Sequence, residues 1–282
     1  MRQIQQSKTE HINRRMSDVL NIQLRKFNPE TIRDDKICIF IGRRGTGKST
    51  LVTDILYHKR HLPAGIVMSG TEDGNHHYKS FIPDIFIYGG YNRDAVVRLV
   101  ERQKRLIATG KVPPVFLLMD DLMFDKSFLK DPLIREIFLN GRHWGIFVML
   151  TTQYSLDLPP AIRQNADYVF ILRDNIKRSR ESLYNSFCGM FPSLAIFNQV
   201  MDACTENYEC LVVHTTATSN KIEDCVFYYK APLRRNFRIG SQAMWNFHKT
   251  HYTPNARPAA LQSGVKPSRV VVKKAGNFNQ PG

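Results

Sequence analysis

Residues 42–49 have the spacing G-x-x-x-x-G-K-[ST], with Gly42, Gly47, Lys48 and Ser49 in register. In such a loop the backbone N–H groups surround nucleotide phosphates, the lysine reaches the β- and γ-phosphates, and the hydroxyl binds Mg²⁺. The sequence therefore predicts a site for ATP and Mg²⁺ that comprises Gly42, Arg43, Arg44, Gly45, Thr46, Gly47, Lys48, Ser49 and Thr50. Kinases, GTPases, motors and transporters share this pattern, so it does not choose among them.

Two carboxylates follow the apolar run "VFLLM", and a glutamine follows the next run in "LTTQ". At the end of such a strand, Asp120 is expected to hold the water shell of Mg²⁺ together with Ser49. Asp121 is then placed to polarise the attacking water as a general base. Gln153 can contact the γ-phosphate or that water. The plain alternatives are helix caps for the two aspartates and an ordinary polar turn for Gln153.

These side chains need strands that end at one edge of a sheet. Short apolar runs alternate with amphipathic runs along the chain. Strands are expected at 36–41, 64–70, 84–90, 113–121, 144–153, 166–172 and 208–216, and helices at 48–60, 93–110 and 127–142. This alternation predicts an α/β fold, with a mostly parallel, doubly wound sheet and helices on both faces. Adjacent parallel strands end at the same edge, so the loop, the aspartates and Gln153 should meet there.

The composition favours a globular protein of a cytosol-like compartment. Hydrophobic residues make up 43% of the 282 residues, and no apolar run approaches the ~18 residues of a transmembrane helix. The N-terminal segment lacks the apolar core of a signal peptide. The five cysteines are scattered and form no C-x-x-C pair, so buried free thiols are expected rather than disulfides or structural zinc.

Positive charge is concentrated at the C-terminus. The net charge is +15, and the last acidic residue is Asp224. Residues 233–282 carry nine Lys or Arg and no acid, with Trp245, Phe247 and Tyr252 among them. Such a segment can bind nucleic acid, or it can anchor on the core or dock to a partner protein. We therefore predict an N-terminal arm at 1–35, a P-loop ATPase domain at 36–232 and a basic, partly disordered tail at 233–282.

Four motifs together carry a resemblance to a known family. They are "GRRGTGKS", "FLLMDD", "GRHWGIFVMLTTQ" and "LPPAIRQNADYVFILRD". In this order they resemble the FtsK–HerA group of P-loop ATPases, which have a RecA/FtsK-like fold. More narrowly, they are similar to the genome-packaging ATPase of nucleocytoplasmic large DNA viruses, the poxvirus and giant-virus type. The resemblance covers residues 37–229.

The resemblance implies ATP hydrolysis coupled to translocation of double-stranded viral DNA into a capsid. It implies a homo-oligomeric ring that binds DNA without sequence preference, with capsid or inner-membrane virion proteins as further partners. The location implied is the virus assembly site in the host cytoplasm, and the virion. Lys48, Ser49, Asp120 and Gln153 match the family's pattern, whereas Asp121 stands where the wider group usually has glutamate, one methylene longer.

Ring ATPases of this group are expected to receive an arginine from a neighbouring subunit. Arginine supplied in trans neutralises charge in the loose transition state of phosphoryl transfer. Arg142 is the first candidate because it lies in the matching G-R-x-x-G-I segment. Arg163 is the second candidate and Arg173 the third. Each could instead be an ordinary surface or ion-paired arginine.

Other functions fit parts of the sequence. A cellular-type FtsK/HerA translocase would share every motif, and a P-loop kinase would share the phosphate loop but would need an acceptor site and an arginine-bearing lid. A terminase with a separate C-terminal nuclease is excluded, because a metal-dependent nuclease needs clustered carboxylates and none follows Asp224. A non-catalytic DNA-binding scaffold would not need Lys48, Ser49 and both aspartates.

Overall fold

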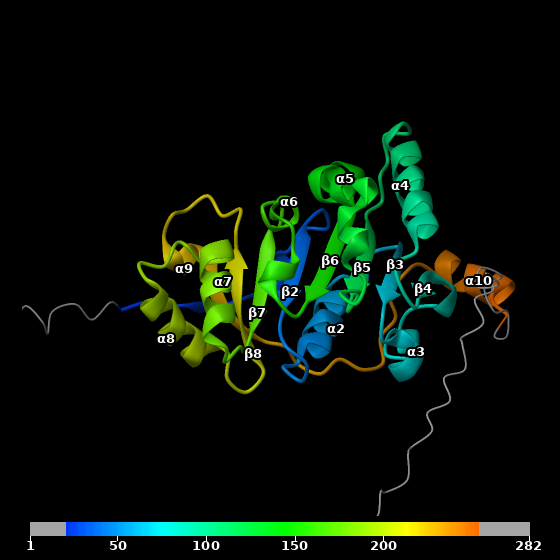
Figure 1. The fold of residues 1–282 in the computed structure, drawn as a ribbon. Helices are drawn as coiled ribbons and strands as arrows, with labels where there is room; N and C mark the ends of the chain where they lie inside the picture. The colour runs from blue at the N-terminus through cyan, green and yellow to red at the C-terminus, as the bar shows by residue number, and fades with distance from the viewer. Residues whose placement is uncertain (1–20, 254–282) are drawn as a thin grey trace, which may run out of the picture.

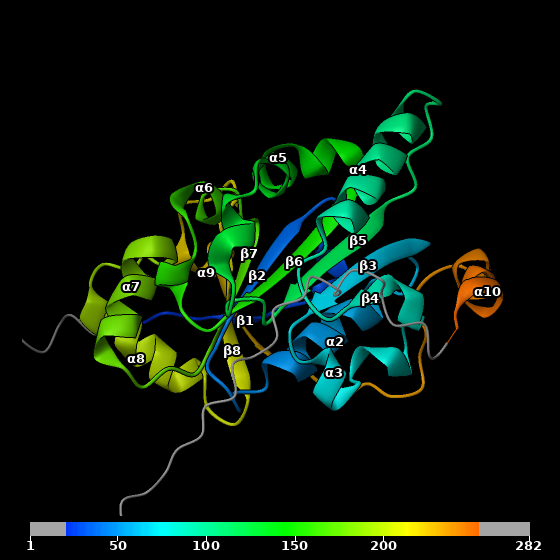
Figure 2. The same cartoon turned by 45° about the vertical axis from the view of Figure 1, so that its right-hand side comes forward.

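A computed structural model describes residues 21–253 of the chain, and these form one sheet with helices on both faces (Figures 1 and 2). The strand order in the sheet is β1-β9-β8-β7-β2-β6-β5-β3-β4. The strands are β1 (Arg25–Lys26), β2 (Ile37–Ile41), β3 (Ala64–Ser69), β4 (Ile87–Tyr88), β5 (Val115–Asp120), β6 (Ile146–Thr152), β7 (Tyr168–Leu172), β8 (Glu209–His214) and β9 (Val226–Lys230).

Six consecutive strands of this sheet, from β4 to β7, run parallel. Strand β8 is antiparallel to both β7 and β9, and β1 is parallel to β9. The predicted mostly parallel sheet is therefore confirmed. In the register, Ile41 at the end of β2 lies opposite Thr152 at the end of β6, and Ser69 of β3 lies opposite Asp120 of β5. These strands therefore finish at one edge.

The helices divide between the two faces because side chains alternate along each strand. On β2, Ile37, Ile39 and Ile41 join one core cluster, and Cys38 and Phe40 join the other. The first face is covered by α4 (Arg93–Ile107), α5 (Pro132–Asn140), α6 (Pro160–Arg163), α7 (Lys177–Phe187) and α8 (Leu194–Cys204). The second face is covered by α2 (Lys48–His58) and, towards the rim, by α10 (Gln242–His251). The described residues also form two short helices, α3 (Glu72–Asn75) and α9 (Ile222–Cys225).

The predicted boundaries at residues 35 and 232 do not coincide with breaks in packing. From the N-terminal arm, β1 pairs with β9, and Phe27 and Ile32 are buried in the core of the second face. From the basic tail, Ile239 and Met244 are buried in the same core. These apolar side chains extend the domain beyond the motif-bearing segment. Residues 1–20 and 254–282, which include most of the predicted tail, lie outside the described residues.

Two predicted elements differ in detail. The strand expected at 84–90 is a 3-10 turn, η3 (Asp84–Phe86), followed by the two-residue β4. The helix expected at 127–142 divides into η4 (Lys126–Lys130), α5 and η5 (Gly141–Trp144). Pro132 causes the first break, because it disfavours helical backbone at the residue before it and suits the first helical turn. A membrane-spanning helix is not found among residues 21–253.

Candidate functional site

The phosphate-loop sequence forms a tight turn between β2 and α2, and its glycines have distinct structural roles. Gly45 and Gly47 have φ angles of 80° and 93°, which side-chain-bearing residues rarely adopt. At Gly42 a Cβ atom would lie 2.8 Å from Cδ1 of Leu172. The loop begins where the Gly42 N–H donates to Thr152 O at 3.1 Å. The motif glycines therefore set the turn and its close approach to β7.

The predicted phosphate, metal and water residues meet in one cavity of about 430 Å³. Its lining comprises Arg43, Arg44, Gly45, Gly47, Lys48, Ser49, Thr50, Thr71, Asp120, Asp121, Gln153 and Tyr208. These residues come from the ends of three strands that are neighbours in the sheet, β2, β6 and β5, and from two loops. Of the predicted loop residues, Gly42 and Thr46 lie just outside this lining, and Thr46 Oγ1 donates to Arg43 O at 2.8 Å.

Asp120 is held in a fixed orientation at the end of β5. The residue is only 5% exposed. Its Oδ2 accepts a hydrogen bond from Tyr78 Oη at 2.8 Å, and its Oδ1 accepts one from Thr151 Oγ1 at 2.7 Å. Burial, together with the Asp120 carboxylate, holds the pKa of Tyr78 well above its ordinary value. Tyr78 therefore stays a protonated donor to Asp120.

Asp121 leaves the strand in a left-handed conformation. Its φ is 50°, a conformation that is uncommon for a residue other than glycine. Its backbone N–H donates to Thr151 Oγ1 at 3.0 Å. One hydroxyl of β6 thus contacts both aspartates. The turn brings Asp121 into the cavity beside Asp120 instead of pointing it to the far side of the sheet, as strand alternation would.

Lys48 lies at the start of α2 with its amine close to the loop. Its Nζ donates to Gly42 O at 3.2 Å. Burial lowers the pKa of Lys48 below its ordinary value, and the charges of Asp120 and Asp121 oppose that shift. Ser49 beside it is exposed. The cavity therefore offers a bound ligand one cation, one exposed hydroxyl and two acidic side chains.

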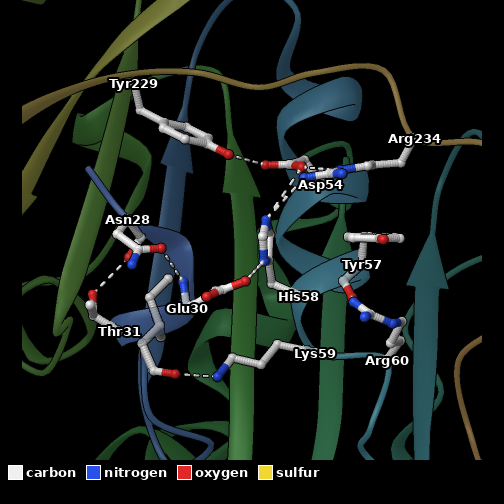
Figure 3. A network of polar contacts seen from close by, with 11 residues as sticks. Asn28, Glu30, Thr31, Asp54, Tyr57, His58, Lys59, Arg60, Tyr229 and Arg234 are labelled. Carbon is white, nitrogen blue, oxygen red and sulfur yellow. Dashed lines mark hydrogen bonds and ion pairs between the residues drawn. The ribbon is translucent and has the colours of Figure 1, made fainter. Parts of the chain in front are cut away.

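Helix α2 is anchored towards its C-terminal end by a network of polar contacts (Figure 3). Asp54 is 0% exposed. Its carboxylate accepts hydrogen bonds from Tyr229 Oη at 2.5 Å and from Arg234 Nε at 2.7 Å, and His58 Nε2 lies 3.7 Å away. Lys59 donates to Ile32 O and, at 2.7 Å, to Asp34 Oδ1. The network joins α2 to β9 and to the segments before β2 and after β9.

The three candidate arginines lie in different places. Arg142 is exposed in η5, which precedes β6 and therefore lies at the opposite end of that strand from Gln153. Arg163 ends α6 and donates to Ser186 Oγ at 3.1 Å. Arg173 follows β7 and lines a second cavity with Arg43 and Arg44. Of the three, Arg173 is the one beside its own phosphate loop. The choice among the three for a role in trans stays a prediction.

Sequence reasoning missed three residues that the structure places at this site. Tyr78 supplies a hydrogen bond to Asp120, Thr151 joins the two aspartates, and Tyr208 lines the cavity from the loop before β8. Thr151 was visible in "LTTQ" as a polar residue at the strand end. Tyr78 begins the 3-10 turn η2 (Tyr78–Ser80) and Tyr208 lies in a loop. Neither segment carries a motif, so the sequence offers no signal for them.

Comparison with known proteins gives the chain a family. No family model matches the sequence. An uncharacterized protein of Acanthamoeba polyphaga mimivirus is 36% identical over 242 residues, which covers 82% of this chain and 85% of that protein. An uncharacterized protein of Invertebrate iridescent virus 6 is 34% identical over 251 residues, which covers 87% and 97% of the two chains. The chain belongs to this family of large-DNA-virus proteins.

Solved structures agree on the fold of this viral family. The genome-packaging NTPase B204 from Sulfolobus turreted icosahedral virus 2, in complex with ATP-gammaS, matches with a TM-score of 0.50 at 19% identity. The match covers 72% of this chain and 100% of B204. The DNA-packaging ATPase B204 from Sulfolobus turreted icosahedral virus matches with a TM-score of 0.51 at 18% identity, over 71% and 100%. The predicted P-loop NTPase fold is therefore confirmed.

Proposed function

We propose that this protein is an ATP-hydrolysing motor that translocates double-stranded DNA during viral genome packaging. The observation that carries the proposal is the shared cavity, where the phosphate loop meets Asp120, Asp121 and Gln153. Such a set can bind a triphosphate, neutralise its charge and activate water. The viral relatives and the B204 fold favour packaging over a cellular-type FtsK/HerA translocase, whose active site would be the same.

ATP and Mg²⁺ fit the residues present. The loop backbone and Lys48 would hold the phosphates, and the lysine amine, now donating to Gly42 O, has further protons to donate. Ser49 and Asp120 would hold Mg²⁺, Asp120 through water. Each oxygen of Asp120 accepts one hydrogen bond and keeps a second lone pair for that water. Bound Mg²⁺ supplies charge neutralisation to the phosphates.

Hydrolysis is favoured over transfer to a second substrate by two side chains. Asp121 can accept a proton from the attacking water, and Gln153 can orient that water towards the γ-phosphate. Both line the cavity beside Lys48. A P-loop kinase would need a dedicated acceptor site, and it remains the rival candidate because its phosphate loop would be identical.

Translocation needs a DNA contact that does not depend on sequence and a coupling between subunits. The net charge of +15 favours phosphate contacts, which are non-specific and salt-sensitive. We further propose a homo-oligomeric ring in which Arg142, or else Arg163 or Arg173, reaches the neighbour's γ-phosphate. Capsid or inner-membrane virion proteins would anchor the ring, at the assembly site in the host cytoplasm and in the virion.

The variant Lys48→Ala tests the proposal. We expect phosphate release from ATP to fall to background in this variant, and binding to DNA to stay within about twofold of the wild type. Lys111→Ala is the matched control, because Lys111 is exposed and precedes β5, whereas Asp120 ends that strand at the cavity. Turnover by wild-type protein should rise with double-stranded DNA of any sequence. Surviving turnover in Lys48→Ala would refute the site, and a rate indifferent to DNA would favour the kinase.

A further inference from the structure

Tyr208 presents an aromatic ring to solvent directly over the phosphate loop. It lies between α8 and β8 and is 69% exposed. A Cβ atom built on Gly47 would lie 3.1 Å from Tyr208 Cδ1 and 3.5 Å from Tyr208 Cβ. Most aromatic rings of the described chain are buried or half-buried, whereas the open face of Tyr208 beside the loop is available to a ligand that enters the site.

The backbone that carries Tyr208 is strained. Asn207 and Tyr208 are consecutive residues with φ angles of 49° and 65°, in the left-handed region that non-glycine residues adopt at a free-energy cost. The loop is closed by the Glu209 N–H, which donates to Glu206 O at 2.8 Å. A relaxed loop would allow the ring to pack elsewhere. This loop instead holds it at the mouth of the site.

The space beside the ring is large enough for a nucleoside. A cavity of about 640 Å³ adjoins the phosphate cavity and shares five of its lining residues, Arg43, Arg44, Gly45, Gln153 and Tyr208. The rest of its lining comprises Thr46, Tyr154, Arg173, Asn175, Thr205 and Asn207. A triphosphate placed on the loop therefore leaves open space next to Tyr208 for the remainder of the molecule.

We propose that Tyr208 forms the base subsite of the nucleotide site, with its ring stacked on the purine of a nucleoside triphosphate. The proposal rests on the proposed function, because it assumes that residues 42–49 bind the phosphates. Every base has a π face, and stacking on an aromatic side chain stabilises it without reading its edges. A purine offers the larger face. The subsite therefore favours purine over pyrimidine nucleotides and discriminates only weakly between ATP and GTP.

Two probes separate base binding from phosphate binding. ATP carries the base, whereas inorganic tripolyphosphate carries only the phosphates. We expect Tyr208→Ala to weaken ATP binding about tenfold in Kd, within the range found when a stacking aromatic is removed, and to leave tripolyphosphate binding unchanged. Tyr208→Phe keeps the ring and should bind ATP like the wild type. Phe124→Ala is the matched control, because Phe124 is also an exposed loop aromatic but does not line either cavity.

A purely structural role for Tyr208 would give a different result. Tyr208→Gly removes the ring and also relieves the left-handed strain, so it should melt no lower than the wild type and still lose ATP affinity about tenfold. Equal weakening of ATP and tripolyphosphate would show that the ring only shapes the loop, and unchanged ATP affinity would also overturn the proposal. If Lys48→Ala retained turnover, the proposed function itself would fail, whatever the outcome at Tyr208.

Discussion

The two ends of helix α2 use their polar residues in opposite ways. At its first turn Lys48 donates to one backbone carbonyl, and Ser49 is exposed to the cavity. Towards its other end the Asp54 carboxylate has two hydrogen-bond donors and a nearby histidine, and Lys59 contacts a carbonyl and a carboxylate. The polar side chains at the first end can still form hydrogen bonds with a ligand. Those towards the second end already have hydrogen-bond partners within the fold.

The difference separates activity from stability along one helix. Groups that bind phosphate must keep unused hydrogen-bonding capacity in the free protein. Substituting them should therefore change the free energy of unfolding only slightly. Groups buried with their partners contribute to the fold, because a buried charge left without a partner is strongly destabilising. Variants at the cavity should therefore change turnover with little change in melting temperature, and variants in the network of Figure 3 should do the reverse.

The largest effect is expected at the cavity. Asp121→Asn should lower kcat for ATP hydrolysis about 10³-fold, since general-base catalysis contributes roughly 10²–10⁴-fold. The melting temperature should stay the same or rise slightly, because asparagine tolerates the left-handed conformation of residue 121. Steady-state phosphate release and thermal unfolding measure the two quantities. Glu101→Gln, on the exposed face of α4, is the control. A loss below about threefold would remove Asp121 from the mechanism.

In the network of Figure 3, substitution of Arg234 should lower stability and leave kcat nearly unchanged. Arg234→Ala leaves the Asp54 carboxylate buried without its guanidinium partner and also removes the stacking of Arg234 on Tyr57, where the distance to the ring centre is 4.1 Å. We expect a loss of about 3 kcal/mol in the free energy of unfolding, with kcat within about twofold of the wild type. Denaturant unfolding measures the loss.

Arg235→Ala is the matched control for Arg234, one residue along the same segment. Arg235 is exposed and, among the described residues, no ion pair is found for it. Its substitution should change the free energy of unfolding by less than about 0.5 kcal/mol. Equal losses in the two variants would show that the segment contributes general charge rather than a specific pair with Asp54.

Local patterns predicted the phosphate end of α2 and the central strands. The spacing of Gly42, Gly47 and Lys48 determines a turn that few other sequences can form, and the apolar runs that follow determine buried parallel strands. The parallel arrangement then predicts that Asp120 and Gln153 lie beside the loop, which the structure shows. For the phosphate loop and the central strands, the prediction needed only local sequence patterns and the rule that adjacent parallel strands end at the same edge of a sheet.

Contacts between distant residues could not be predicted in this way. Tyr229 and Arg234 reach Asp54 from 175 and 180 residues away, and β1 pairs with β9 although its two residues carry no strand pattern. Tyr78 contacts Asp120 from 42 residues away, in a segment without a motif. Such pairs depend on how the whole chain folds. For the same reason the segment after residue 232 is predicted to be a tail, although Arg234 and Phe237 in its described part contact side chains of α2.

Thr151 tests whether groups at the cavity can contribute to stability as well as to activity. It lies beside the two aspartates, yet its hydroxyl is already hydrogen-bonded within the fold. Thr151→Val removes the hydroxyl that donates to Asp120 and accepts from the Asp121 N–H. Both partners lose a hydrogen bond, so we expect about 2 kcal/mol of destabilisation together with a drop in kcat. Thr151→Ser should restore both quantities. Destabilisation without a loss of kcat would mean that Thr151 belongs functionally with the Asp54 network.

The smallest effect is expected from pH, through His58 in the network. Burial lowers the pKa of His58; Asp54 and Glu30 oppose the shift, and Arg234 and Arg60 add to it. Because the folded pKa is below the unfolded value of about 6.5, the unfolded chain binds more protons under mildly acidic conditions. This contribution to stability is therefore complete above about pH 6.5 and is lost as the pH falls through the folded pKa.

His58→Gln should reduce the slope of unfolding free energy against pH just below about pH 6.5, the ordinary pKa of histidine. It should not abolish the slope, because burial also lowers the pKa of His214, which stacks on Tyr168. His143→Gln, at an exposed position, is the control and should leave the slope unchanged. If the slope in His58→Gln matched the wild type, His58 would have no part in the pH dependence of stability.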